Sequence, residues 1–264
     1  MIIAIVNNKG GVGKTATAVN LAHALALMGK RVLVVDVDPQ CNATGLLRRE
    51  DGYDGFDYTL YDLLSNAAEV SSCIVPTDHE NLFLIPNQPE TASLEPELIS
   101  GAPQSFFRLR NAIRTQALQE FDFTFLDNPP NMGTFVISSL LASDFCIVPT
   151  EAGSRYSMDG LVKAVRLIEE TRQKLNPDLR FLKLLLTKVD RRTRIGKEVF
   201  ERIREIFPKE KVFETYVPIN VDVQKAEFHG KTVLEFRPNC PAARAFFQVA
   251  EELLETVKIF ASKE

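Results

Sequence analysis

The sequence of 264 residues lacks long hydrophobic runs and contains few cysteines and histidines. Its uninterrupted apolar stretches fall well short of the roughly 20 residues of a membrane-spanning helix. The four cysteines are scattered without C-x-x-C spacing, which favours reduced thiols over disulfides or a metal cluster. The three histidines are isolated and lack the spacing of metal ligands. Because the chain starts with a core-type apolar strand, we expect no signal peptide and a cytoplasmic location.

The composition is typical of a globular protein, with 45% hydrophobic residues, 25% charged residues and a formal net charge of −4. Short apolar runs predict strands at residues 2–6, 32–35, 82–85, 123–126, 145–148, 181–187 and 212–215. Helical spacing predicts helices at residues 15–28, 107–118, 158–175, 195–206 and 242–260. This alternation predicts a doubly wound, mostly parallel α/β sheet with helices on both faces, in a single domain over residues 1–264. Residues 48–58 and 86–103 are expected to be surface connections.

A glycine-rich segment links the first predicted strand to the first predicted helix. It has the sequence N-K-G-G-V-G-K-T at residues 8–15. After a strand and before a helix, such glycines let backbone N–H groups turn towards a phosphate. Lys14 then reaches the β- and γ-phosphates, and the Thr15 hydroxyl is placed to ligate Mg²⁺. Asn8 replaces the first glycine of a standard P-loop, and Lys9 adds a second cation to the loop.

Two predicted strands end in carboxylates. Residues 32–35 run into Asp36 and Asp38, and residues 123–126 run into Asp127. Ligands bind at the carboxyl ends of the strands in such sheets, and a buried carboxylate is costly unless a cation or a donor meets it. One such aspartate could merely cap a turn. For the whole set beside a P-loop we expect Asp127 to hold the metal, Asp38 to orient or deprotonate the attacking water, and Asp36 to support the metal site.

Together these motifs resemble the deviant Walker A ATPases of the ParA/MinD group. The segments that carry the resemblance are K-G-G-V-G-K-T at 9–15, D-V-D-P-Q at 36–40 with N-A-T at 42–44, and D-N-P-P at 127–130. Two further segments resemble the ParA branch: L-T-K-V-D-R-R-T at 186–193 and V-P-I-N-V at 217–221, leading to Ala226 and Gly230. The resemblance extends from residue 2 to about residue 255 and implies a P-loop NTPase fold.

The resemblance implies an ATP-dependent switch. ParA-like proteins bind ATP and Mg²⁺, dimerise around two nucleotides, bind DNA non-specifically and hydrolyse ATP slowly when a ParB-like or other partner stimulates them. Lys9 would be the signature lysine that reaches the phosphates of the opposite subunit, and Asp38 and Asp127 would lie in the two switches. The implied catalytic residues are Lys9, Lys14 and Asp38. The implied nucleotide contacts are Lys9, Gly10, Gly11, Val12, Gly13, Lys14, Thr15, Ala16, and, on the adenine side, Thr187, Lys188, Pro218 and Asn220. The implied metal residues are Thr15, Asp36 and Asp127.

Several positions depart from the family's pattern. Ala16 stands where many relatives have a second threonine, and Asn128 precedes the two prolines in place of Thr, Cys or Ala. Cys41 replaces a usual glycine, which predicts that a positive φ is not required there. Ile219 and Asp222 stand where nucleoid-binding relatives usually have arginines, so this face carries less positive charge than theirs.

A basic segment nevertheless favours DNA contact. Between residues 188 and 211 there are nine Lys/Arg and five Asp/Glu, so this segment carries +4 and the rest of the chain −8. We expect Arg191, Arg192 and Arg194, in a strand-to-helix turn, to contact the phosphates of duplex DNA. The alternative is a solvated helix with ion pairs between successive turns.

Other classes of protein remain open. A MinD-like membrane-cycling ATPase would need an amphipathic anchor, but the polar side of the C-terminal helix carries Glu251, Glu252 and Glu255. We therefore expect that helix to pack on the sheet, with no membrane contact. A metabolic P-loop ligase should lack Lys9, and an iron-protein-like ATPase needs paired cysteines, whereas Cys41 alone lies near a switch. The favoured interpretation is a nucleoid-associated homodimer that moves a chromosome, a plasmid or a protein assembly.

Overall fold

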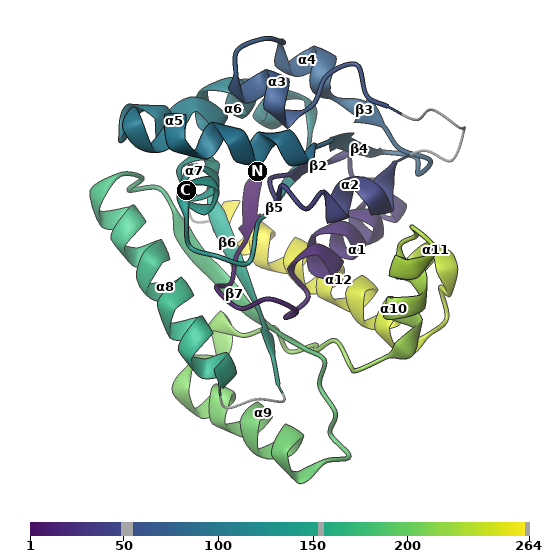
Figure 1. Cartoon of the computed structure of the whole chain (residues 1–264). Helices are drawn as coiled ribbons and strands as arrows, with labels where there is room; N and C mark the ends of the chain where they lie inside the picture. The colour runs from purple at the N-terminus through teal and green to yellow at the C-terminus, as the bar shows by residue number, and fades with distance from the viewer. Residues whose placement is uncertain (49–54, 153–155, 262–264) are drawn as a thin grey trace.

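The structure is a computed structural model. It describes the backbone of residues 1–48, 55–152 and 156–261, and their side chains except at 156–159, 194–197, 199, 204 and 259–261. Within this part of the chain, seven strands form one sheet in the order β3-β4-β2-β5-β1-β6-β7 (Figure 1). The strands are β1 (Ile2–Ile5), β2 (Val32–Asp36), β3 (Val75–Pro76), β4 (Leu82–Ile85), β5 (Phe123–Asp127), β6 (Phe145–Glu151) and β7 (Arg180–Thr187). All neighbours are parallel except β3 and β4, which confirms the predicted doubly wound sheet.

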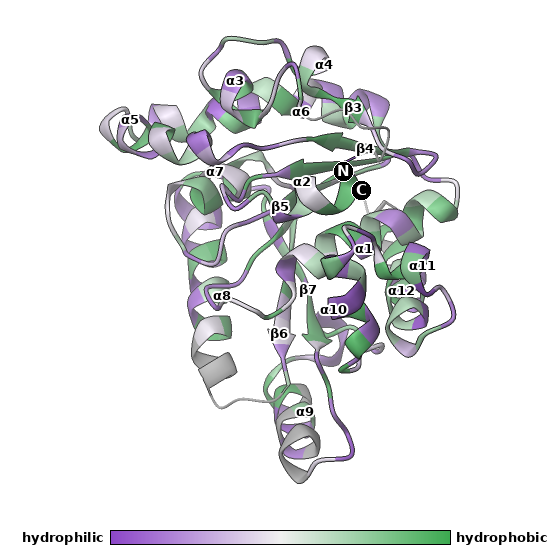
Figure 2. Cartoon of the chain, turned by 45° about the vertical axis from the view of Figure 1, so that its right-hand side comes forward, coloured by the Kyte–Doolittle hydropathy of each residue, from purple (hydrophilic) through white to green (hydrophobic). Residues whose placement is uncertain are grey.

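Helices cover both faces of this sheet. On one face lie α1 (Lys14–Leu27), α2 (Asn42–Leu47), α10 (Val221–Phe228), α11 (Val233–Phe236) and α12 (Pro241–Ala261). On the other lie α3 (Leu60–Leu64), α4 (Val70–Cys73), α5 (Glu95–Ser100), α6 (Arg108–Glu120), α7 (Thr134–Ala142), α8 (Tyr156–Lys174) and α9 (Arg194–Ile206), with the 3₁₀ turns Pro89–Leu94 and Gln104–Phe107. The alternation of β1 explains the layers: Ile3 and Ile5 pack with α1 and α12, whereas Ile2 and Ala4 pack towards α6 and α8. Figure 2 shows the resulting hydrophobic sheet between helices of mixed hydropathy.

The five predicted helices begin and end within two residues of α1, α6, α8, α9 and α12. The predicted strand at residues 212–215 is wrong: in the described chain it makes a single isolated bridge, at Val212. The backbone N–H groups of Glu214 and Thr215 donate instead to the Glu252 carboxylate, at 2.9 and 2.7 Å. A side chain from α12 therefore takes the donors that a strand would offer to its neighbour.

The expectation of a plain surface connection at residues 86–103 is also wrong in part. This segment contains the 3₁₀ turn Pro89–Leu94 and the helix α5, and each has a proline in its first turn, where a missing N–H costs little. Leu94 and Leu98 are buried in the core that they share with α3, α6 and α7 on this face of the sheet. Part of the other expected connection, residues 48–58, lies outside the described residues.

The C-terminal helix α12 packs on the sheet face beside α1, as expected (Figure 1). Its side chains Phe246, Val249, Ala250 and Leu253 are buried in the same core as α1. Among the helices of the described chain, none combines the length and apolar character needed to cross a bilayer. The apolar side of α12 is therefore occupied by the protein's own core.

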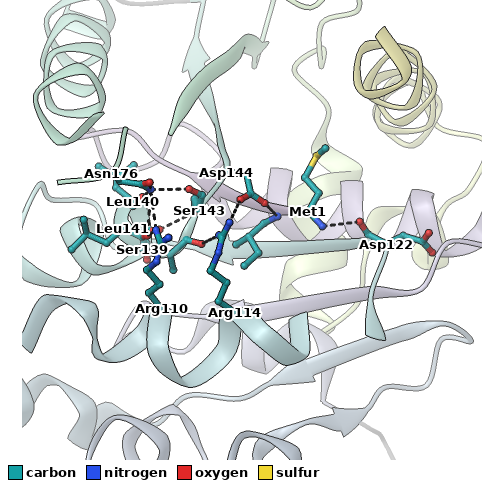
Figure 3. Close-up of polar contacts among 12 residues, drawn as sticks. Met1, Arg110, Arg114, Asp122, Ser139, Leu140, Leu141, Ser143, Asp144 and Asn176 are labelled. Atoms are coloured by element: carbon teal, nitrogen blue, oxygen red, sulfur yellow. Dashed lines mark hydrogen bonds and ion pairs between the residues drawn. The ribbon is translucent and has the colours of Figure 1, made fainter. Parts of the chain in front are cut away.

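A polar network fixes the amino ends of the strands (Figure 3). The backbone N–H of Ile2 donates to the Asp144 carboxylate at 2.8 Å, and Arg114 of α6 donates to the other oxygen of Asp144 at 2.7 Å. The Asn176 amide donates to the carbonyls of Leu140 and Ser143 at the end of α7, at 2.9 and 3.0 Å. These contacts satisfy polar groups at the amino-terminal edge of the sheet.

Candidate nucleotide-binding site

One cavity lies at the carboxyl ends of five strands. The loops after β1, β2 and β5 and the ends of β6 and β7 line it, and Asp36 pairs in register with Asp127 nearby. The cavity has a volume of about 1400 Å³ and is lined by Lys14, Thr15 and Asp38, by α2, by Thr187 and Lys188, and by residues 217–221 and α10. This is the position at which parallel α/β sheets bind ligands.

The phosphate loop has the backbone that its glycines predict. Gly11 and Gly13 have φ values of +72° and +85°, a conformation that costs other residues about 1–2 kcal/mol. Lys14 is buried, and its Nζ donates to the carbonyl of Lys9 at 3.2 Å. Burial lowers the pKa of Lys14, and the nearby carboxylates of Asp127 and Asp38 counteract part of that change. A buried ammonium facing the cavity is suited to bind phosphate oxygens.

Asp127 is wholly buried at the end of β5. Burial and the neighbouring Asp36 raise its pKa, while the Thr15 hydroxyl and Lys14 moderate the increase. Neither carboxylate oxygen has a hydrogen-bond partner of good geometry among the described residues. Since buried carboxylate oxygens without donors are costly, this position fits a divalent cation with its water shell, for which oxygen atoms are the preferred ligands.

Asp36 has a different environment. One of its oxygens accepts from both the backbone N–H and the hydroxyl of Thr44, each at 2.7 Å, and the other accepts from the Asp38 N–H at 3.2 Å. Burial raises the pKa of Asp36, and these hydrogen bonds oppose the increase. Asp36 thus fixes the start of α2 to the end of β2. Its oxygens already have donors, so Asp127 has more capacity than Asp36 to receive a metal ion.

Asp38 and Cys41 form the turn that leads from β2 into α2. Asp38 lines the cavity, is 6% exposed and accepts from the Gln40 N–H at 3.0 Å. Cys41 has φ +56° and ψ +32°, so the expectation that a positive φ is not required there is wrong. Its N–H donates to the Asp38 carbonyl at 2.9 Å, which closes the turn and imposes the left-handed conformation.

Replacing Cys41 with glycine is expected to raise the free energy of unfolding by about 0.5–1 kcal/mol. Glycine adopts this backbone without the steric cost of a Cβ, which outweighs its larger entropy loss on folding. Urea denaturation measures the change. The matched control is Cys41→Ala, which keeps the Cβ and should remain close to the wild type. A glycine variant less stable than the alanine variant would contradict the strain at this turn.

Lys9 lies beside the lining residue Gly10 and forms an ion pair within its own chain. Its Nζ is 2.9 Å from Oε2 of Glu151 at the end of β6, and both side chains are 30% exposed. Its backbone N–H donates to the side chain of Asn7 at 3.0 Å. Glu151 and Asn7 were not predicted as site residues. Glu151 is distant in the sequence, and Asn7 precedes the loop but lies outside the phosphate-binding motif.

The residues predicted on the adenine side also line the cavity. The Thr187 hydroxyl donates to the Val12 carbonyl at 2.8 Å, which ties the end of β7 to the phosphate loop. Lys188 has a positive φ of 50°. Asn220 caps α10 by accepting from the Asp222 N–H at 2.7 Å, so its side-chain oxygen helps to set the position of the loop at residues 217–221.

The predicted DNA-binding residues lie in the turn between β7 and α9. Arg191 is exposed, and its guanidinium lies 5.2 Å and 5.8 Å from the ring centres of Phe200 and Tyr216. Arg192 is 86% exposed and donates to both carboxylate oxygens of Asp190, at 2.9 and 3.0 Å. The side chain of Arg194 lies outside the described residues. The turn therefore brings two arginines to the surface, each with an intramolecular partner.

A strand-to-helix phosphate loop, a buried lysine and an unsatisfied carboxylate at the end of the neighbouring strand define a P-loop nucleotide-binding protein. Residues 1–181 match a family model described as an AAA domain. The chain is 39% identical over 258 residues to the chromosome-partitioning ATPase Soj of Thermus thermophilus, covering 97% of this chain and 96% of that protein. It is 36% identical over 255 residues to the chromosome partitioning protein ParA of Myxococcus xanthus, covering 96% and 88%.

A solved structure that is similar to this chain contains a nucleotide and a metal ion. Cobyrinic acid a,c-diamide synthase from Mycobacterium smegmatis, with bound ADP and magnesium, has a TM-score of 0.82 to this chain at 27% identity, covering 97% of this chain and 95% of that one. The chain belongs to the Soj/ParA family of chromosome-partitioning ATPases. It is accordingly an ATPase, which confirms the sequence-based prediction of the activity.

Proposed function

We propose that this ATPase is a switch that dimerises around two ATP molecules, binds duplex DNA without sequence preference and hydrolyses ATP slowly under stimulation by a partner protein. The observation that carries the proposal is the presence of two lysines in one phosphate loop, in different environments. Lys14 is buried and lines the cavity, whereas Lys9 lies beside the lining residue Gly10 with a side chain that is 30% exposed. One lysine can serve the subunit's own phosphates while the other extends to a second subunit.

The cavity residues divide the work of hydrolysis in this proposal. Lys14 binds the phosphates of its own nucleotide, and Thr15 and Asp127 hold Mg²⁺, which when bound offsets phosphate charge. Asp38 orients the attacking water from its position at the cavity wall. Lys9 of the second subunit supplies positive charge where negative charge develops, so that hydrolysis depends on assembly. Lys188, Pro218 and Asn220 flank the adenine.

DNA contact is proposed for the turn between β7 and α9. The ion pair of Arg192 with Asp190 is exposed, and such pairs contribute only about 0–1 kcal/mol, so a DNA phosphate can compete for the guanidinium. Arg191 is also exposed, and its contacts with the rings of Phe200 and Tyr216 use the charge of the guanidinium and not its N–H donors, which can bind a phosphate. A cytoplasmic protein with this surface would associate with the nucleoid and move a chromosome, a plasmid or another cargo with a ParB-like partner.

The triple variant Arg191→Glu/Arg192→Glu/Arg194→Glu is expected to weaken binding to an arbitrary duplex at least about tenfold in low salt with ATP, because phosphate contacts are lost. Fluorescence anisotropy with ATP and ADP at several salt concentrations measures it. The matched control reverses three charges on α8, at Lys163, Arg166 and Lys174, and should bind like the wild type. Equal binding by both variants, or no binding by the wild type with ATP, would count against the DNA interface.

A further inference from the structure

The ion pair between Lys9 and Glu151 joins two segments that lie 142 residues apart in the sequence. Glu151 ends β6 and belongs to the wall of the nucleotide cavity. We propose that Glu151 holds Lys9 inside its own subunit and that release of this ion pair limits assembly of the ATP-bound dimer. The inference rests on the proposed function, in which Lys9 acts on the nucleotide of the second subunit.

The backbone around Lys9 is fixed independently of this ion pair. The Asn7 side chain donates to the Pro149 carbonyl at 2.8 Å and accepts from the Lys9 N–H at 3.0 Å, so the loop is attached to the end of β6. On α8, Gly160 allows close packing: a Cβ there would lie 3.0 Å from Asn7 Oδ1 and 3.5 Å from the Lys9 Cβ. Because the loop backbone is held, transfer of Lys9 to a second subunit requires a movement of its side chain.

The Glu151 carboxylate and a phosphate bound in another subunit compete for the Lys9 ammonium. The ion pair at 2.9 Å directs this ammonium to its own subunit, so neutralising Glu151 removes the competing negative charge. Both partners are 30% exposed, a setting in which an ion pair changes an equilibrium by up to about fivefold. A dimer needs the release of two such lysines, so the dissociation constant of the dimer would rise by up to about 25-fold through this competition.

Glu151→Gln removes the carboxylate charge and keeps the size of the side chain. With Mg²⁺ and a non-hydrolysable ATP analogue, we expect its dimer dissociation constant to be about 5- to 25-fold lower than that of the wild type. Sedimentation velocity over a range of protein concentrations measures it. The matched control is Glu169→Gln, which breaks the exposed ion pair with Arg172 on α8 and should leave assembly unchanged.

The double variant Lys9→Ala/Glu151→Gln separates the effect of the ion pair from a general change at this face. It should show no gain in assembly over Lys9→Ala, because the gain depends on the released lysine. A Glu151→Gln protein that dimerises no better than the wild type, or a gain that persists without Lys9, overturns the role of Glu151. Assembly and hydrolysis of Lys9→Ala at the wild-type level would instead overturn the proposed action of Lys9 in the second subunit.

Discussion

Lys9→Ala is expected to bind ATP with nearly the affinity of the wild type and to lose at least about 100-fold in its hydrolysis rate. The reason is the different placement of the two loop lysines. Lys14 is buried and lines the cavity, whereas Lys9 is 30% exposed and pairs with Glu151. Positive charge delivered to a developing phosphate charge from a second subunit contributes about 10³–10⁵ in rate in the systems where it has been measured, so a 100-fold loss is a conservative expectation.

Binding of a fluorescent ATP analogue and steady-state phosphate release at saturating ATP separate the two effects. Lys14→Ala is the contrasting variant, because removal of the buried ammonium should abolish nucleotide binding itself. Lys9→Ala also leaves Glu151 without this partner, so Lys9→Ala/Glu151→Gln controls for the residual carboxylate. Wild-type turnover by Lys9→Ala would show that Lys9 does not act on the phosphates.

The phosphate loop and the strand-end aspartates could be predicted because their chemistry is local in the sequence. Gly11 and Gly13 adopt left-handed backbone where the motif requires it. Asp127 ends a short, wholly buried strand, and in a parallel sheet such an ending places it at the same edge as the loop after β1. Short-range patterns of this kind are sufficient to locate a site, since the sheet topology then brings the strand ends together.

Contacts between distant segments could not be predicted in the same way. One partner of Lys9 is Glu151, and nothing in the spacing of the two residues reveals their proximity. The segment at residues 212–215 has the composition of a strand, but the Glu252 carboxylate captures its N–H groups from the C-terminal helix. The first outcome depends on the pairing of β1 with β6 and the second on where α12 packs, and both are properties of the tertiary structure.

Cys41 shows a different limit. The residue type suggested that the backbone there is unstrained, yet the turn closed by the Asp38 carbonyl imposes a positive φ. A sequence can tolerate about 1 kcal/mol of such strain when the surrounding contacts fix the turn. The anchoring of α2 by Asp36 and Thr44 provides those contacts, so residue identity alone is a poor indicator of conformation at this point.

The stability of the protein is expected to fall by about 2 kcal/mol between pH 7 and pH 5 through a single buried histidine. The ring of His23 on α1 stacks on His79, with centroids 3.9 Å apart, and its Nδ1 lies 2.7 Å from the Thr232 hydroxyl. Burial and, to a smaller extent, the neighbouring His79 together lower the pKa of His23 to about 3. The unfolded chain takes up a proton at His23 near pH 6.5, whereas the folded protein does not.

The sign follows from this difference in proton binding. Above pH 7 both states carry neutral His23 and the effect vanishes, while below pH 6.5 protonation of the unfolded state favours unfolding until the pH reaches about 3. The raised pKa values of Asp36 and Asp127 have the opposite effect on stability. As the pH falls, these two carboxylates bind protons in the folded state before they do so in the unfolded state. The contribution of His23 must therefore be measured as a difference between two proteins in which those carboxylates are unchanged.

Urea denaturation of the wild type and of His23→Gln at pH 7 and pH 5 provides that difference. The wild type should lose about 2 kcal/mol more than the variant over this interval, even if the variant is less stable at both pH values. His229→Gln, at an exposed position, should keep the wild-type dependence. An identical loss in His23→Gln and the wild type would mean that the stacked histidines do not carry the acid sensitivity. His23, His79 and Thr232 come from α1, from the turn before β4 and from the start of α11. A smaller pH dependence in His23→Gln than in the wild type would therefore support this buried contact between three separate segments.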